Sequence, residues 1–252
     1  MPPPLIAIVM AMEAEAAPLR AALDARSIAS PDWATALPAR VMHTATAPGG
    51  AEVVLATNGI DPATGVDCIG TTAAALTTHV LLESCRTHVG RLPDVVLSVG
   101  TAGGWIRSGT EIGDVYLAWD RFVCHDRRID LPGFDRFGRG DIPAADLRSH
   151  ATALGCRLGV VTTGDSLDES ADDAARIRAS GAEVKEMEAA AVAWVASLHS
   201  VPVSAIKAIT DHVDDPAPTA EQFQANLHTA ASALQRTTTA LLERLGAAAT
   251  TS

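Results

Sequence analysis

Short apolar runs alternate with stretches of helical spacing along this chain. The runs are almost continuously apolar, as expected for strands that are covered on both faces of a largely parallel sheet. They occupy residues 5–10, 53–56, 94–99, 115–124, 157–163 and 202–210. The alternation therefore predicts an α/β fold.

Helical spacing of apolar residues follows most of these runs. Helices are expected from about Glu15, because Pro18 fits only a first turn, and over residues 66–85, 144–154 and 171–179. A buried helix should begin near Glu188, and a long one should run from Thr219 to about Leu245. We interpret residues 1–252 as one domain, with a frayed tail at 246–252.

Two stretches lack a regular pattern. Residues 27–50 contain several prolines and are interpreted as a peripheral hairpin or loop. Residues 132–138 form an irregular stretch of the length that usually serves a function or an interface.

Composition narrows the function. With 252 residues, 48% hydrophobic and 19% charged, the chain can bury a full core. Its net charge of −11 argues against a nucleic-acid partner, which would require clustered Lys and Arg. Because no apolar run approaches the ~20 residues of a membrane span, we expect no membrane association and a cytoplasmic protein.

Cysteine and glycine spacing argues against two further classes of site. The four cysteines are widely separated, so neither a metal site nor a disulfide framework is indicated. The glycine loop at residues 100–104 follows a strand but lacks the G-x-G-x-x-G spacing of a dinucleotide site, which disfavours a dehydrogenase.

Acids and small polar residues recur where the predicted strands end. In a parallel sheet these ends share one edge, where ligands bind, so we expect an acidic pocket suited to a neutral or cationic polyhydroxylated substrate. The residues are Glu15, Thr101, Asp165, Glu188 and Asp211. Glu188 and Glu15 each have an alternative interpretation, since an acid in a first helical turn stabilises the helix dipole.

Six motifs in register resemble the 5′-methylthioadenosine/S-adenosylhomocysteine nucleosidases of the purine nucleoside phosphorylase superfamily. The resemblance extends from Ile6 to about Leu245 and is greatest to the plant-type branch. It implies a three-layer α/β/α fold with a central mixed, largely parallel sheet. The motifs lie at residues 11–15, 99–104, 112–115, 164–166, 186–191 and 208–211.

The resemblance also implies roles for individual residues in cleaving an N-glycosidic bond. Asp211 would protonate the adenine N7, and Glu15 would activate water. Glu188 would accept hydrogen bonds from the ribose hydroxyls. Neither a cofactor nor a metal is implied. The remaining substrate contacts would come from Met187 at the sugar, Thr101 near the water, the glycine loop at Gly103 and the backbone around Leu167.

The chain departs from the family pattern at two places. Lys207 stands where the bacterial branch has Arg, and residues 214–218 match neither branch, which leaves the pocket for the 5′ substituent undefined. Family members are homodimers, so residues 131–137 are our candidate for the partner's contribution. Plant-type relatives favour methylthioadenosine over adenosylhomocysteine.

Rival interpretations stay open at this point. A futalosine-type or other specialised nucleosidase would share the fold and differ in the 5′ pocket. A nucleoside-binding protein without activity would also share the fold, although the presence of Asp211, Glu188 and Glu15 argues against it.

Overall fold

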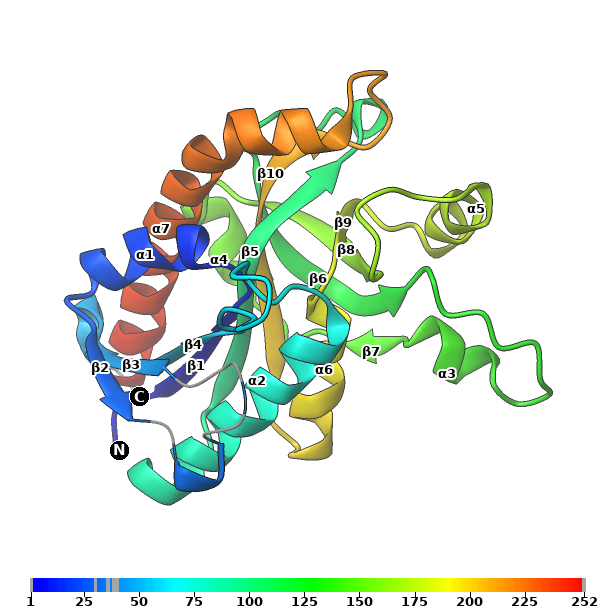
Figure 1. The fold of residues 1–252 in the computed structure, drawn as a ribbon. Coiled ribbons are helices and arrows are strands. Elements are labelled where there is room, and N and C mark those ends of the chain that lie inside the picture. The colour runs from blue at the N-terminus through cyan, green and yellow to red at the C-terminus, as the bar shows by residue number, and fades with distance from the viewer. Residues whose placement is uncertain (1, 30, 35–36, 38–40, 251–252) are drawn as a thin grey trace.

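A computed structural model describes residues 2–29, 31–34, 37 and 41–250. Helices cover both faces of a mixed sheet (Figure 1). On one side lie α1 (Glu13–Ala22), α4 (Arg148–Leu154) and α7 (Thr219–Thr250), and on the other lie α2 (Thr71–Ser84) and α6 (Ala189–Leu198). This confirms the predicted α/β class and its layered arrangement. The strands are β1 (Leu5–Met10), β2 (Arg26–Ala29), β3 (Val41–Thr46), β4 (Glu52–Thr57), β5 (Val95–Gly104), β6 (Val115–Cys124), β7 (Ile142–Pro143), β8 (Arg157–Thr163), β9 (Val184–Glu186) and β10 (Val203–His212).

The sheet runs in the order β10-β6-β8-β9-β5-β1-β4-β3-β2, and β10 also pairs with β5. These five strands, β5, β9, β8, β6 and β10, therefore close into a ring. Pairings of β1 with β4 and β5, and of β5 with β10, are parallel, whereas β10–β6 and β5–β9 are antiparallel. Ring closure brings the ends of β5, β9 and β10 together.

Six of the seven α-helices in the described residues match their predicted positions, with different ends, whereas the helix at Asp135–Arg139 lies in a stretch that was predicted to be irregular. These helices are α1 (Glu13–Ala22), α2 (Thr71–Ser84), α3 (Asp135–Arg139), α4 (Arg148–Leu154), α5 (Ala171–Ser180), α6 (Ala189–Leu198) and α7 (Thr219–Thr250). The prediction of a helix from residue 66 was wrong, because Gly70 adopts φ of 94° and the helix begins after it. The predicted start of α4 at residue 144 was also too early.

Helix α7 continues to Thr250, past Gly246, where the sequence predicted the start of a frayed tail. Gly246 explains the continuation. A Cβ atom there would lie 2.5 Å from the carbonyl oxygen of Gly49, so the glycine lets α7 pack directly on the Pro48–Gly50 turn. Residues 251–252 lie outside the described part of the chain.

Two large apolar clusters form the core, one on each side of the sheet. The first joins the sheet to α2 and α6, and the second joins it to α1 and α7. Among the described residues, no helix combines the length and apolarity that crossing a bilayer requires.

Candidate functional site

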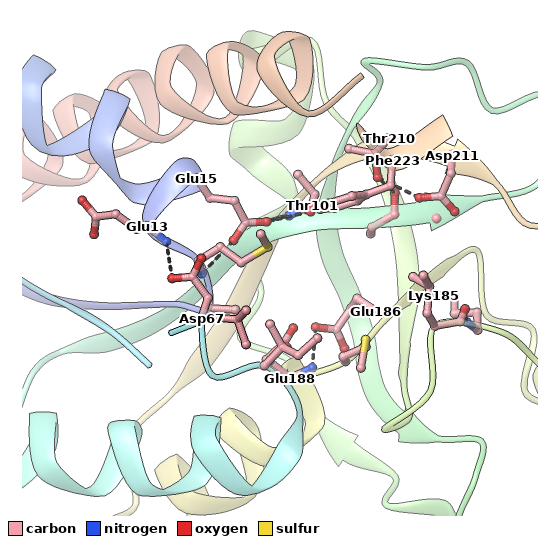
Figure 2. A pocket seen from close by; sticks show the side chains of 18 of the residues that line it. Glu13, Glu15, Asp67, Thr101, Lys185, Glu186, Glu188, Thr210, Asp211 and Phe223 are labelled. Carbon is pink, nitrogen blue, oxygen red and sulfur yellow. Dashed lines mark hydrogen bonds between the residues drawn. The ribbon is translucent and has the colours of Figure 1, made fainter. Parts of the chain in front are cut away.

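A cavity of about 620 Å³ lies where β5, β9 and β10 end (Figure 2). Of the eight residues that the sequence nominated, all but Asp165 line it, so the structure brings together side chains from positions 15 to 211. They are Glu15, Thr101, Gly103, Leu167, Met187, Glu188 and Asp211. Convergence of strand ends is the physical reason for the grouping.

Glu15 lies in the first turn of α1 and is 3% exposed. Its Oε1 accepts hydrogen bonds from the backbone N–H of Thr101 at 2.7 Å and from the Thr101 hydroxyl at 2.6 Å. Its Oε2 accepts a weaker bond from Met12 N–H at 3.3 Å. Helix α1 and strand β5 thus hold one carboxylate rigidly at the cavity wall.

Glu188 is the N-cap residue of α6, but its side chain does not cap the helix. Its Oε1 instead accepts the N–H of Gly70, 2.8 Å away, in the turn before α2. Glu186 caps α6, because its Oε2 accepts the N–H groups of Glu188 and Ala189 at 3.0 and 2.8 Å. Glu188 therefore lies at the start of the helix, as the sequence predicted, but the side chain that caps the helix is that of Glu186.

Lys207 lies beneath these glutamates as a buried cation. Its Nζ is 2.9 Å from Glu186 Oε2 and 3.2 Å from the hydroxyl of Ser98. Glu186, Glu188 and Glu15 together hold the pKa of Lys207 above its usual value in spite of burial. Because the lysine offsets part of the negative charge, the cavity floor is less acidic than the sequence indicated.

The pKa of Glu188 is raised to about 7, from an ordinary 4.5. Burial is the largest cause, and repulsion from Glu186 adds to it. Attraction to Lys207 and the Gly70 hydrogen bond act in the opposite direction. Near neutral pH, Glu188 is therefore close to its midpoint of ionisation and can accept hydrogen bonds from hydroxyl groups.

Asp211 is placed by an irregularity in β10. The pairing of β10 with β5 shifts between Ile209 and Asp211, which leaves Thr210 as an extra residue. Ala208 pairs with Thr101 and Asp211 with Gly103. Residues 101 and 103 share a face of the sheet, so the extra residue turns Asp211 onto the face of Thr101.

The carboxyl group of Asp211 lies directly above Gly103. A Cβ atom at Gly103 would lie 2.6 Å from Asp211 Oδ2, so only glycine leaves room for the acid. Asp211 is 4% exposed, and the Thr210 hydroxyl donates to its Oδ1 at 2.8 Å. Burial raises the pKa of Asp211, while Thr210, Lys185 and His212 lower it in part.

Lys185 lines the same cavity, and sequence reasoning gave it no role. It is buried, and its Nζ donates to the carbonyl oxygens of Leu167 at 2.5 Å and Ser166 at 3.3 Å. Burial lowers the pKa of Lys185, which Glu169 and Asp211 partly counteract. The only signal in the sequence was the rarity of lysine, since Lys185 and Lys207 are the only two lysines in the chain.

Two further acids near the cavity are held by other contacts, and only Asp165 among them was predicted to belong to the pocket. Asp165 accepts the backbone N–H and hydroxyl of Thr71, both at 2.6 Å, and so anchors the start of α2. Glu13 borders the cavity but is paired with Arg20. The charge of Glu13 is thereby matched, and the pKa of its carboxyl is lowered by that contact.

An apolar wall completes the cavity, and the sequence did not predict it. The residues of this wall come from the loop before α2, from the turn after β10 and from α7, and they follow no periodic pattern in the sequence. They are Ile60, Val66, Ile69, Val213 and Phe223. Several remain exposed, including Ile60 at 54% and Val66 at 61%.

The arrangement suits acid-assisted cleavage of a substrate that has an apolar part and hydroxyl groups. A buried acid with raised pKa can donate a proton near neutral pH. A carboxylate such as Glu15, held by three donors, can orient a water molecule. The apolar wall can enclose a ring or a thioether.

Comparison with known proteins agrees with this geometry. A family model described as the phosphorylase superfamily matches residues 5–243. A 5′-methylthioadenosine nucleosidase of Arabidopsis thaliana is 42% identical over 184 residues, which cover 73% of this chain and 66% of that protein. A 5′-methylthioadenosine/S-adenosylhomocysteine nucleosidase of the same plant is 37% identical, over 73% of this chain and 70% of that protein.

Solved structures extend the match over the whole fold. The apo structure of Arabidopsis thaliana 5′-methylthioadenosine nucleosidase superimposes with a TM-score of 0.88 at 36% identity and covers 97% of each chain. A futalosine hydrolase of Helicobacter pylori, at 23% identity and a TM-score of 0.75, shares the fold alone. The chain belongs to the phosphorylase superfamily and, within it, to the family of 5′-methylthioadenosine/S-adenosylhomocysteine nucleosidases.

Proposed function

We propose that this chain hydrolyses the N-glycosidic bond of 5′-methylthioadenosine and releases adenine and a 5-thioribose. Family membership sets the reaction class, because its relatives are nucleosidases. One observation carries the assignment of roles. A buried acid of raised pKa, Asp211, shares a single cavity with Glu188 and Glu15.

Asp211 is the general acid in this proposal. Cleavage leaves electrons on the purine, and a proton at N7 stabilises the leaving base as the ribosyl carbon becomes positive. The pKa of Asp211 lies above its ordinary value because the carboxyl is buried, which favours the protonated form. Gly103 leaves the space in which that carboxyl lies.

Glu188 and Met187 bind the sugar. The carboxylate of Glu188 has one oxygen bonded to Gly70 N–H, and it accepts the ribose 2′- and 3′-hydroxyls when ionised. Glu186 fixes the backbone of Glu188 through the helix cap, so the sugar site is preorganised. Met187 borders the cavity beside it and packs on the ribose.

Glu15 activates the attacking water, and Thr101 stands beside it. Both donors from Thr101 bind the same oxygen, Oε1, so Oε2 carries only the long contact from Met12. Oε2 is therefore the oxygen better able to accept a proton from water. Phosphate is disfavoured as the nucleophile, because Glu15 and Glu188 would repel a dianion.

The adenine ring lies against Leu167 in this proposal. The Lys185 ammonium binds the carbonyl oxygens of Ser166 and Leu167 and so fixes the backbone that reads the purine edge. Lys185 is also close enough to Asp211 to lower the pKa of that acid in part. The positive charge of Lys185 thus limits how far burial raises the pKa of Asp211.

The chain acts as a homodimer in this proposal, and residues 131–137 of one protomer complete the 5′ pocket of the other. The support is exposure of large apolar side chains in that loop, namely 57% for Leu131, 43% for Phe134 and 55% for Phe137. Light scattering on the eluted peak of a sizing column measures the oligomeric state. A monomer that is fully active at assay concentration would contradict the proposal.

Substitution of the acid tests the mechanism. Asp211→Asn keeps the shape but cannot donate the proton, so kcat for methylthioadenosine should fall by roughly 10²–10⁴. Adenine release by the purified protein is the assay, with methylthioadenosine, adenosylhomocysteine, adenosine, inosine and futalosine compared in parallel. Near-normal activity of the variant would refute the role of Asp211, and a preference for futalosine would refute the substrate.

A further inference from the structure

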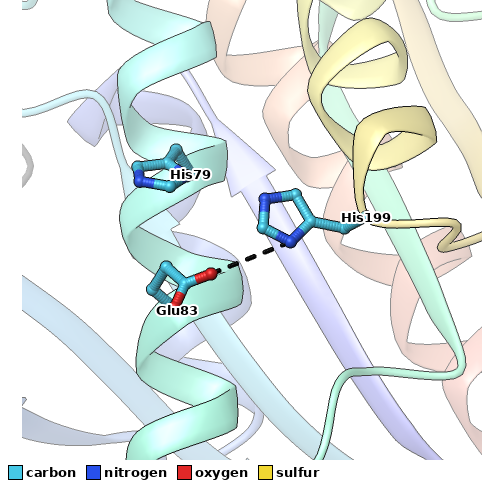
Figure 3. A group of neighbouring side chains, drawn as sticks. All are labelled: His79, Glu83 and His199. Carbon is cyan, nitrogen blue, oxygen red and sulfur yellow. Dashed lines mark ion pairs between the residues drawn. The ribbon is translucent and has the colours of Figure 1, made fainter.

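Two histidines and a glutamate meet outside the cavity, on the side of the molecule where α2 packs against α6 (Figure 3). His79 and Glu83 lie on α2, and His199 is the C-cap residue of α6. One ligating atom from each lies within 4.8 Å of the other two. None of the three lines the cavity described above.

Helix geometry makes this grouping a stable feature of the fold. His79 and Glu83 are four residues apart, so they project from one face of α2. The contact between α2 and α6 belongs to the larger apolar cluster, which fixes His199 relative to that face. A sequence gives no warning of such a site, because His199 is distant in the chain.

A direct hydrogen bond does not account for the arrangement. Glu83 Oε1 and His199 Nδ1 are 3.8 Å apart, which is longer than a hydrogen bond between a carboxylate and an imidazole. The imidazole rings of His79 and His199 have centroids 5.7 Å apart. These separations leave room between the three groups for an ion.

The ligand chemistry matches a divalent transition metal. Zn²⁺ binds imidazole nitrogen and carboxylate oxygen at about 2.0–2.2 Å. The three ligand atoms lie within 4.8 Å of one another, so even at that limit each would need to move only about 0.6–0.8 Å inward to reach a central ion, which side-chain torsions permit. Burial, the largest cause, lowers the pKa of His199, which favours the neutral imidazole that a metal requires.

We propose that His79, Glu83 and His199 bind one divalent transition metal ion of the Zn²⁺ type, with water in the remaining positions. The site is separate from the catalytic cavity and is not needed for hydrolysis. Two neutral imidazoles and one carboxylate would leave the bound ion a net positive charge, which an outer sphere of water can stabilise.

Arg86 is the competing cation. Its Nη1 lies 3.5 Å from Glu83 Oε1, and its Nη2 lies 3.5 Å from His199 Nδ1. The Arg86 side chain is 53% exposed, so it can turn into solvent when a metal enters. Removal of Arg86 should therefore strengthen metal binding. If His79, Glu83 and His199 were only a polar cluster that binds no metal, removal of Arg86 would not change metal binding.

Titration calorimetry of the full-length, untagged, metal-free protein with Zn²⁺ tests the proposal. One ion should bind per chain, and His79→Ala and His199→Ala should each weaken binding by at least about tenfold. His228→Ala removes an exposed histidine of α7 as a matched control and should change nothing. Arg86→Ala should tighten binding severalfold, because it removes a positive charge beside the ion.

A second measurement identifies the ligands. Co²⁺ added in place of Zn²⁺ should give an absorption spectrum typical of nitrogen and oxygen ligands, and this spectrum should disappear in His199→Ala. A thiolate charge-transfer band, or equal Zn²⁺ affinity in wild type and both histidine variants, would overturn the proposal. Adenine release should be unchanged in His79→Ala, which separates this site from the proposed nucleosidase function.

Discussion

Glu188→Gln should make the protein more stable at alkaline pH while it weakens the catalytic site. The substitution keeps the shape of the side chain and removes its charge. In the wild-type protein the pKa of Glu188 is raised to about 7 from 4.5, mainly by burial, so the folded state disfavours the ionised form. The amide has no such charge to bury.

The sign and size follow from proton linkage. Between pH 4.5 and about 7, folded wild-type protein binds more protons at Glu188 than unfolded protein does, so its free energy of unfolding falls as pH rises. Each pKa unit corresponds to about 1.4 kcal/mol. The variant should therefore match the wild type near pH 4.5 and exceed it by up to about 3 kcal/mol above pH 7.

Urea unfolding followed by tryptophan fluorescence measures this difference at several pH values. Glu221→Gln, which changes an exposed glutamate of α7, serves as the control and should show no pH-dependent difference. A Glu188→Gln variant that is less stable than wild type at pH 8.5 would refute the reasoning. It would mean that the Gly70 hydrogen bond and Lys207 outweigh burial.

Three further results are expected. The wild-type kcat/KM should fall as pH drops below about 7, where Glu188 becomes protonated, and a pH–rate profile that stays flat to pH 5.5 would contradict its role. Lys207→Met leaves Glu186 as an unpaired buried charge and should cost about 3–5 kcal/mol in urea unfolding, with partial recovery in the double variant with Glu186→Gln. Gly103→Ala should displace Asp211 and lower kcat by at least about tenfold. Gly104→Ala, whose Cβ would meet Thr110 instead, is its comparison, and equal losses in both would argue for general misfolding.

The sequence predicted the elements that long apolar runs encode, together with the residues at their ends. Glu15, Glu188 and Asp211 could be grouped before any coordinates because strand ends in an α/β sheet converge. Glu186 and Glu188 could not be told apart in this way. Both flank Met187, and their roles depend on which carboxylate reaches the N–H groups of α6 and which reaches Gly70.

Other features depend on contacts between distant segments and left no local pattern. Ring closure through the pairing of β10 with both β5 and β6 is a tertiary property. The extension of α7 past Gly246 follows from its packing on the Pro48–Gly50 turn, whereas the local composition of alanine and threonine indicated fraying. The apolar wall of the cavity comes from loops, where periodicity carries no information.

The extra residue in β10 makes strand register, as well as residue type, a determinant of where the acid points. If β10 ran in regular register through Thr210, Thr210 would lie opposite Gly103, and Asp211 would lie opposite Gly104 on the other face of the sheet. The same residues in the same order would then hold the carboxyl group away from Glu15 and Glu188. The order of residues in the motif therefore does not by itself place the acid in the cavity, and the irregular pairing of β10 with β5 is part of the site.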